Sequence, residues 1–190
     1  MRLHWYFYKA ENRSNMANAN RVGSFVIMVL ALAAAPASAE PPPPKLLGTY
    51  ADWQAYTMTE GKGEICYAVS KPKKLEPVKA KRTEVHLLVT HRPADKQNNV
   101  VSVELGYPAA KDSNAAVLVG KDKYDFFTKE QTAWARDSET DKNVVTAMAR
   151  GTALVAKAKP ASGSETIDTY SLAGFSDALA QIDKACKVKR

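Results

Sequence analysis

Over most of the chain, short stretches alternate between apolar and polar residues and are separated by turn residues. In the segment 100–107, valine, leucine and tyrosine at the odd positions alternate with serine, glutamate and glycine at most of the even positions. A period of two places one set of side chains on each face of a β-strand. Gly61-Lys62-Gly63 and Gly120-Lys121-Asp122-Lys123 are typical of hairpin turns. The pattern predicts strands over residues 50–58, 64–70, 84–91, 100–107, 115–119, 124–127, 132–136, 152–158 and 166–172.

The period changes near the C-terminus, where apolar residues recur at helical spacing. Residues 140–150 read as a first helix, with a capping-box-like start at Ser138 and Asp141 and a stop at Gly151. Residues 175–186 read as a second helix that closes the domain. The apolar stripe of this second helix consists of Phe175, Leu179, Ile182 and Cys186.

Many short strands joined by hairpins predict a mainly β fold. We expect an antiparallel β-sandwich of the immunoglobulin-like kind with two added helices, one of them at the C-terminus. The predicted domain covers residues 47–190, and a proline-rich spacer at residues 40–46 precedes it. This length suffices for one domain with its own core, and no internal repeat is evident.

The first 39 residues have the pattern of an export signal. Arg21 supplies positive charge, Val22–Ala35 is an apolar run, and Ala37-Ser38-Ala39 fits a cleavage site before Glu40. The apolar run is shorter than the roughly 20 residues that span a bilayer. The polar and aromatic residues 1–15 make Met16 an alternative start. We therefore expect a cleaved signal peptide and a periplasmic or secreted protein without a transmembrane span.

The charge of the chain changes little in this interpretation. The whole chain has a formal charge of +7, and residues 1–39 carry four basic residues against Glu11. The remaining +4 is only mildly basic and gives no reason to expect a nucleic-acid partner.

Two cysteines, Cys66 and Cys186, are the only ones in the chain. In an oxidising compartment an even number of cysteines predicts a disulfide, and two allow a single pairing. A redox or nucleophilic thiol is the alternative, but the chain has no C-x-x-C motif. We expect a Cys66–Cys186 bridge that joins the last helix to an early strand.

The histidines of the predicted domain, His86 and His91, lie five residues apart on one predicted strand. This spacing points them to opposite faces, so one metal ion cannot bind both. No G-x-S-x-G motif is present, and no nucleophile can be paired with a base from the sequence. The sequence predicts no metal, no cofactor and no catalytic residue. An exported hydrolase that uses His91 with a serine or aspartate brought close by folding stays as an alternative.

A basic segment lies between the second and third predicted strands. Such a run can simply be solvated or can protect a sheet edge, or it can contact an anionic component of the envelope or host surface. No aromatic residue interrupts it, which disfavours nucleic acid. The candidate contact residues are Lys71, Lys73, Lys74, Lys79, Lys81 and Arg82.

Aromatic residues leave two interpretations open. Trp53, Trp134 and Tyr107 can form a binding face, or they can fill the core, as tryptophan often does. We expect at least one tryptophan in the core, and the sequence does not say which.

Eight short segments, taken together in their order, carry a family resemblance: Asp52–Tyr56, Ile65–Tyr67, Val89–Pro93, Asn99–Ser102, Gly106–Pro108, Thr132–Arg136, Asp168–Leu172 and Ile182–Cys186. They resemble the invasion-associated locus B family of alphaproteobacterial envelope proteins, in particular its rhizobial-type members. The resemblance covers about residues 46–188 and depends on the order and spacing of the segments. It implies an exported β-sandwich-like domain, a named role in host-cell invasion and no established catalytic activity, so no catalytic residue carries over. Many relatives have a cysteine soon after the first-strand tryptophan, and residues 54–64 have none here.

The sequence thus favours an exported, non-catalytic envelope protein that binds an envelope or host-surface component. Besides the hydrolase, a structural or chaperone-like component is an alternative, because an exposed strand edge can pair with a partner.

Overall fold

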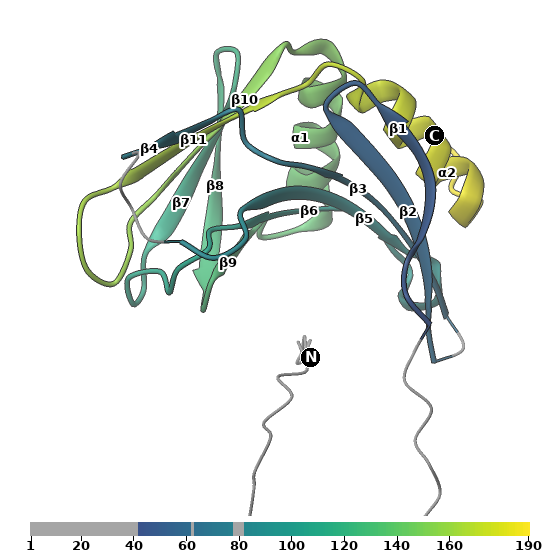
Figure 1. The fold of residues 1–190 in the computed structure, drawn as a ribbon, viewed down its shortest axis with the longest axis horizontal. Coiled ribbons are helices and arrows are strands. Elements are labelled where there is room, and N and C mark those ends of the chain that lie inside the picture. The colour runs from purple at the N-terminus through teal and green to yellow at the C-terminus, as the bar shows by residue number, and fades with distance from the viewer. Residues whose placement is uncertain (1–41, 62, 78–81) are drawn as a thin grey trace, which may run out of the picture. The chain divides into compact units, whose positions relative to one another are not determined.

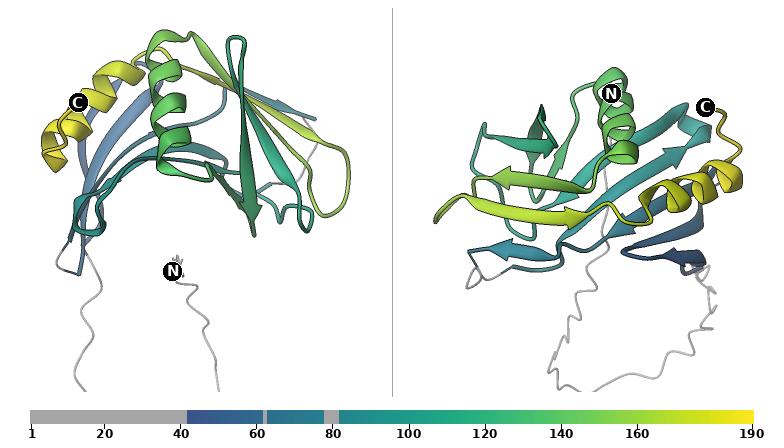
Figure 2. Two further views of the ribbon diagram at one scale, coloured as in Figure 1. Left: turned by 180° about the vertical axis from the view of Figure 1, so that it is seen from behind. Right: turned by 90° about the horizontal axis from the view of Figure 1, so that it is seen from above.

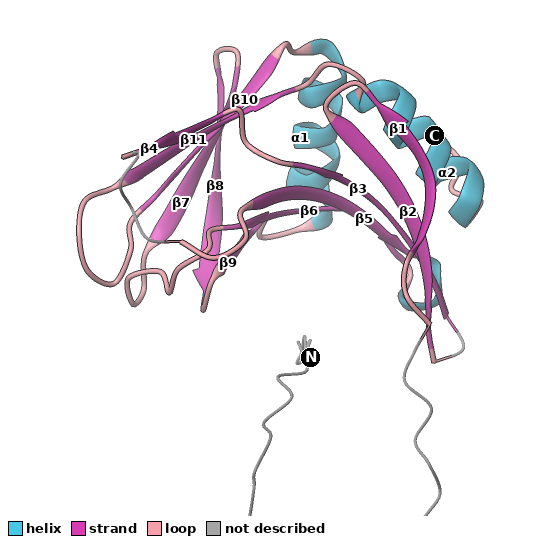
Figure 3. Cartoon of the chain, viewed as in Figure 1, coloured by secondary structure: helices cyan, strands magenta, loops and turns pink. Residues whose placement is uncertain are grey.

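The computed structural model describes residues 42–61, 63–77 and 82–190. The expected signal peptide, the start of the spacer, Lys79 and Lys81 lie outside the described residues. Eleven strands and two α-helices follow one another, with one 3₁₀ turn, η1, at Pro93–Asp95. Figure 3 distinguishes the helices from the strands. The strands are β1 (Lys45–Tyr50), β2 (Trp53–Glu60), β3 (Gly63–Ser70), β4 (Lys74–Glu76), β5 (His86–Arg92), β6 (Gln97–Glu104), β7 (Asn114–Val119), β8 (Asp122–Lys129), β9 (Thr132–Trp134), β10 (Ala153–Ala158) and β11 (Thr166–Ser171), and the helices are α1 (Ser138–Arg150) and α2 (Phe175–Cys186).

All the described strands belong to one antiparallel sheet, in the order β1-β2-β3-β5-β6-β9-β8-β7-β10-β11-β4. The mainly β class with two helices, one of them C-terminal, is confirmed. The two separate sheets of an immunoglobulin-like sandwich are not confirmed, because the short strand β9 pairs with both β6 and β8. This double pairing joins the two halves of the domain into a single bent sheet.

Strands β2, β3, β5 and β6 form an arch, and α2 lies on its outer side (Figure 1). Helix α2 packs on β1, β2, β3 and β5, and α1 packs mainly on β6. In the view from above in Figure 2, α2 lies over the strands of this arch. The face of the sheet that turns toward the helices carries the core.

Alternation along each strand explains why the core lies on this face. On β3 the side chains of Cys66 and Ala68 are buried, whereas Tyr67 and Val69 between them are only half-buried. The predicted division of this strand into two faces is therefore confirmed. On the core face, β2 contributes Trp53 and α2 contributes Phe175, with their ring centroids 4.8 Å apart.

The N-terminal part of the domain is hydrogen-bonded directly to the C-terminal part. The indole of Trp53 donates to the carbonyl of Ser171 at 3.0 Å, and the Asp52 N–H donates to the Ala173 carbonyl at 3.2 Å. Gly174 is needed at the start of α2, because its φ is 85° and a Cβ there would lie 2.0 Å from the Tyr50 carbonyl oxygen. This close approach seats α2 against the turn between β1 and β2.

Some element boundaries differ from the sequence prediction. Residues 45–50 form β1, although residues 45 and 46 were assigned to the spacer, and residues 74–76 form β4 inside the basic segment. Asp137, and not Ser138, caps α1 by accepting from the Thr140 N–H at 2.7 Å. Gly151 follows the helix as predicted and donates to the Ala147 carbonyl. The C-terminal helix has the predicted bounds.

Candidate functional site

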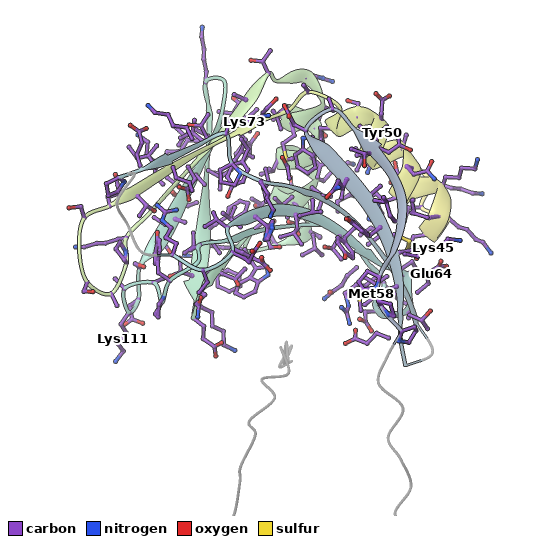
Figure 4. The ribbon with its side chains drawn as sticks, in the orientation of Figure 1. Lys45, Tyr50, Met58, Glu64, Lys73 and Lys111 are labelled. Atoms are coloured by element: carbon purple, nitrogen blue, oxygen red, sulfur yellow. A yellow bond between two sulfur atoms is a disulfide. The ribbon has the colours of Figure 1, made fainter. Side chains whose placement is uncertain are left out.

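The described lysines of the basic segment are exposed, and each faces a carboxylate. Lys71 lies 3.5 Å from Glu84, Lys73 lies 2.5 Å from Asp52, and Lys74 lies 3.0 Å from Glu76. Lys73 is labelled in Figure 4, where β3 leads toward β4. The Lys73 ammonium lowers the pKa of Asp52. An anionic ligand at these lysines would therefore have to displace carboxylates that already bind them.

The structure corrects the place of Arg82. Its side chain is only 4 % exposed, and its Nη1 donates to both carboxylate oxygens of Asp168 at 2.7 and 2.8 Å. The same guanidinium donates to the Glu76 carbonyl and lies over the Tyr107 ring. Burial raises the pKa of Asp168, and the hydrogen bonds from Arg82 oppose the rise. Arg82 therefore anchors the end of the segment in the core and does not present a charge to a partner.

This buried polar cluster also contains tyrosines. The Tyr107 hydroxyl bonds to the Thr166 hydroxyl, whereas Arg82 Nε and the Tyr170 hydroxyl have no hydrogen-bond partner among the described groups. Burial raises the pKa of Tyr170 well above its ordinary value, so this hydroxyl stays protonated. The cluster has no solvent-exposed member, and it ties β11 to the connector between β4 and β5.

His91 is paired with an acid but is fully buried. Its Nε2 lies 2.9 Å from Asp183 Oδ1, and its Nδ1 accepts from the Asn99 N–H at 3.0 Å. The ring is therefore neutral with its proton on Nε2, because Nδ1 must accept. Burial lowers its pKa, and Asp183 opposes the shift. With both nitrogens engaged and no solvent access, this ring cannot take a proton from a substrate without rearrangement.

His86 lies on the other face of β5, as the spacing predicted. Its Nδ1 lies 2.9 Å from Glu104 on the neighbouring strand. Among the described residues, no three His, Cys, Asp or Glu side chains gather as a metal site.

Cys66 and Cys186 have their sulfur atoms 2.08 Å apart, at disulfide distance. The bond joins β3 to the last turn of α2 across 120 residues of sequence. Cys66 is also the register partner of His91 on β5. The disulfide and the His91–Asp183 contact therefore hold the same end of α2.

The most unusual surface is the face of the sheet opposite the two helices. Cross-strand register aligns two rows of side chains across it. Neither row contains a charged residue, although a quarter of the chain is charged. We call these two rows the uncharged strip. The first row is Gln54, Val69, Leu88, Ser102, Trp134, Phe127 and Asn114, and the second is Tyr56, Tyr67, Thr90 and Val100.

The aromatic residues of the uncharged strip form two stacked pairs. Tyr56 and Tyr67 have ring centroids 5.3 Å apart with planes at 16°, and Phe127 and Trp134 are 5.7 Å apart at 29°. All four are half-buried, and none belongs to the core cluster. Cross-strand aromatic pairs usually stabilise a sheet by less than about 1 kcal/mol. Four large rings on an uncovered face therefore contribute little to the fold.

A shallow surface pocket of about 290 Å³ lies at the tip of the β2–β3 hairpin. Arg92 lines it and pairs with Asp95 at 2.9 Å and with Glu60. The pocket lies beyond the Tyr56–Tyr67 end of the uncharged strip, because its lining residue Ile65 is the register partner of Met58 and lies two residues before Tyr67 on β3. Figure 4 labels Met58 near the lower end of β2.

A family comparison covers most of the described fold. A family model described as "Invasion associated locus B (IalB) protein" matches residues 53–183. The chain belongs to the IalB family. The match begins at the first residue of β2 and ends at Asp183, the partner of His91. No curated protein and no solved structure matches this IalB family member.

Sequence reasoning named only one member of the uncharged strip in this IalB domain. Of the three aromatic candidates, Trp53 and Tyr107 are buried in the core, whereas Trp134 is half-buried on the free face. The other members could not be identified because the sequence does not show the register between strands. Alternation shows that Tyr67 and Val69 share a face, but only strand pairing shows that Tyr67 meets Tyr56 and that Trp134 meets Phe127.

Proposed function

We propose that this IalB family member is an exported, non-catalytic protein of the cell envelope that binds a partner through the uncharged strip. The observation that supports this proposal most is a set of half-buried aromatic side chains on a sheet face that neither helix covers. Partly exposed aromatic and apolar side chains that continue over several strands are found at interaction sites.

Export is supported by the sequence of residues 1–39 and by the cysteine pair. The leader pattern ends at Ala39, and Cys66 and Cys186 lie at disulfide distance, as an oxidising compartment favours. Within the described residues, no helix combines the length and the apolar character needed to cross a membrane.

The absence of catalysis is supported by the state of His91. This histidine was the one named base of the hydrolase alternative, and it is buried with both ring nitrogens hydrogen-bonded. Asp183 orients the ring, as an acid does in a triad, but it also pairs with Arg190. The contacts fit a structural role at the end of α2.

An anionic envelope or host-surface component stays a prediction for the basic segment. Lys71, Lys73 and Lys74 have side chains that are 74 %, 58 % and 63 % exposed, so they can exchange one carboxylate for another anion. Replacing these three lysines by glutamine should weaken association with anionic vesicles if the segment binds. Unchanged association would show that Lys71, Lys73 and Lys74 do not bind an anionic partner.

Strand addition is a second candidate, favoured by a specific observation. The large hydrophobic side chains that are exposed in the described part of the chain are Leu46, at 49 %, and Leu75, at 37 %. They lie on β1 and β4, the two edge strands of the sheet. Edge strands can pair with an extended partner. However, β4 is only three residues long and β1 contains a register shift between Leu46 and Gly48, and both features usually protect edges.

Photocrosslinking in living cells tests these proposals together. A photoreactive phenylalanine analogue replaces Tyr56 or Phe127 on the uncharged strip, Leu75 on the edge, or Lys121 at the β7–β8 hairpin as a matched exposed control. The periplasmic fraction is then analysed by mass spectrometry. Export predicts that the recovered chain begins at Glu40.

The outcomes separate the candidates. Reproducible capture of one envelope component from positions 56 and 127, with none from position 121, supports binding through the strip. Capture only from position 75 supports strand addition instead. Efficient irradiation without capture at any position would overturn the binding role, and a cytoplasmic chain that keeps residues 1–39 would overturn export.

A further inference from the structure

The uncharged strip has a composition that restricts its ligand. Its eleven positions combine four aromatic rings, three aliphatic side chains and four uncharged polar groups. Seven of these side chains can donate or accept hydrogen bonds without carrying a charge, including the hydroxyls of Tyr56, Tyr67 and Ser102, although Thr90 is buried. Such a surface is apolar and hydrogen-bonding at once.

Charged groups border the strip. At its β7 end, Arg136 donates to Asn114 of the strip at 2.8 Å, and the charged groups at its other borders are paired with each other. On one side, Glu104 bonds to His86 at 2.9 Å. On the other side, Arg92 pairs with Asp95 and Glu60. Away from Arg136, a charged ligand lying on the strip would lose hydration and find no opposite charge, which is costly. Electrostatic complementarity therefore favours an uncharged ligand.

The spacing of the aromatic pairs suggests an elongated ligand. Tyr67 lies on β3 and Trp134 on β9, with β5 and β6 between them. Three strand spacings of about 4.8 Å and one two-residue step of about 7 Å separate them by about 16 Å. Thr90, Ser102, Val100 and Leu88 lie between the two pairs. A ligand that touches both pairs must extend over several sugar-sized units.

We propose that the uncharged strip binds a neutral glycan chain, with the two aromatic pairs as stacking platforms. This proposal rests on the proposed binding function and names the partner class. A neutral sugar ring presents C–H groups on its faces, which pack on aromatic rings, and hydroxyls at its edge, which bond to the strip's uncharged polar groups. An acyl chain would leave the strip's polar groups unpaired, since each of them loses water without gaining a partner. A peptide that binds by strand addition would need a free strand edge, and the strip lies in the middle of the sheet.

Titration calorimetry and tryptophan fluorescence test the proposal with residues 40–190 in their oxidised form. The probes are neutral oligosaccharides of about six sugars, namely cellohexaose, chitohexaose and mannohexaose, with oligogalacturonate as the anionic comparison. Of the two tryptophans in residues 40–190, Trp53 is buried and Trp134 lies on the strip, so ligand binding should change the emission of Trp134.

Variants assign the binding to the strip. Trp134→Ala and Tyr67→Ala should each weaken binding about tenfold or more, because each removes one member of a platform. Leu75→Ala removes an exposed apolar side chain outside the strip and should leave the affinity unchanged. Tyr67→Phe keeps the ring and should retain most of the affinity. This result would show that the weaker binding of Tyr67→Ala comes from the lost ring. Raising NaCl from about 0.05 M to about 0.5 M should not weaken the binding of a neutral ligand.

The results distinguish this proposal from the one on which it rests. Binding of a neutral oligosaccharide that Trp134→Ala and Tyr67→Ala both weaken supports it. Binding only to oligogalacturonate, or binding that these variants leave unchanged, overturns it. If no oligosaccharide binds while positions 56 and 127 still crosslink to a protein or lipid, the proposal of a glycan ligand is wrong, and the proposed binding function remains supported. If neither experiment detects a ligand, both proposals fail.

Discussion

Asp141 is a buried carboxylate whose ionisation opposes folding, and Asp141→Asn should stabilise the protein. The side chain lies in the first turns of α1, is 7 % exposed, and accepts from the Val101 N–H at 2.8 Å. Burial raises its pKa from 3.8 to about 6. Asparagine keeps an oxygen that can accept from Val101 and removes the charge.

The magnitude follows from the pKa. A rise of about two units corresponds to roughly 3 kcal/mol of unfavourable ionisation at neutral pH. Loss of a negative charge near a helix N-terminus costs about 0.3–1 kcal/mol, and the new amide N–H₂ group needs partners, which costs about 1 kcal/mol more. We expect Asp141→Asn to increase the free energy of unfolding by about 1 kcal/mol at pH 7.5.

The sign of the pH dependence provides the sharper test. Between pH 3.8 and about 6, the folded state holds a proton on Asp141 that the unfolded state releases, so the wild type gains stability as the pH falls through this window. Asp141→Asn lacks this gain. The difference in the free energy of unfolding between the variant and wild type should therefore fall by about 2 kcal/mol between pH 7.5 and pH 4.5, and the variant becomes the less stable of the two.

Urea denaturation of residues 40–190 at the two pH values measures both effects. Glu139→Gln is the matched control, because Glu139 lies in the same helical turn but is exposed. It should cost a few tenths of a kcal/mol at pH 7.5 and gain nothing from burial. An Asp141→Asn variant that is less stable than wild type at pH 7.5, or whose difference from wild type does not vary with pH, would refute the reasoning.

Three further predictions concern the polar and covalent links in the core. Arg82→Met or Asp168→Leu alone should destabilise the protein by about 3–5 kcal/mol, because each leaves a buried charge unpaired, whereas the double variant should cost clearly less than the sum; additive costs in a double-mutant cycle would contradict this. Burial lowers the pKa of His91, so the unfolded state binds its proton first and stability should fall as the pH drops below 6.5; His91→Gln should flatten this slope in acid denaturation, and an unchanged slope would exclude His91 as its source. Cys66→Ser with Cys186→Ser should lower the free energy of unfolding by about 4–5 kcal/mol, since the closed loop spans 120 residues; an unchanged denaturation midpoint would argue against the bridge.

The sequence predicted most strands because hydrophobic alternation is a local signal. In residues 64–70, Cys66 and Ala68 are buried on the predicted shared face, and in residues 175–186 the predicted apolar stripe that includes Cys186 is buried. The edge strands were missed for a physical reason. Leu46 and Leu47 are adjacent and break the alternation, and β4 is a three-residue Lys-Leu-Glu segment that reads as a charged connector.

Strand order and surface could not be read from local pattern. Nothing near residues 132–134 indicates that β9 pairs on both sides and merges two halves into one sheet. Arg82 looked like one more cation of a solvated run, because its partner Asp168 is 86 residues away. The stacked pairs of the uncharged strip depend on the same long-range pairings.

The strand order also has a consequence for how the chain folds. Strand β3 is followed in sequence by β4, yet β4 completes the sheet on the far side by pairing with β11, so Leu75 meets Asp168. The contacts of Trp53 with Ser171 and of Cys66 with Cys186 likewise join the two ends of the domain. High contact order slows folding. Because α2 supplies Phe175, Ile182 and Cys186 to the core, the core cannot close before these late residues have been synthesised.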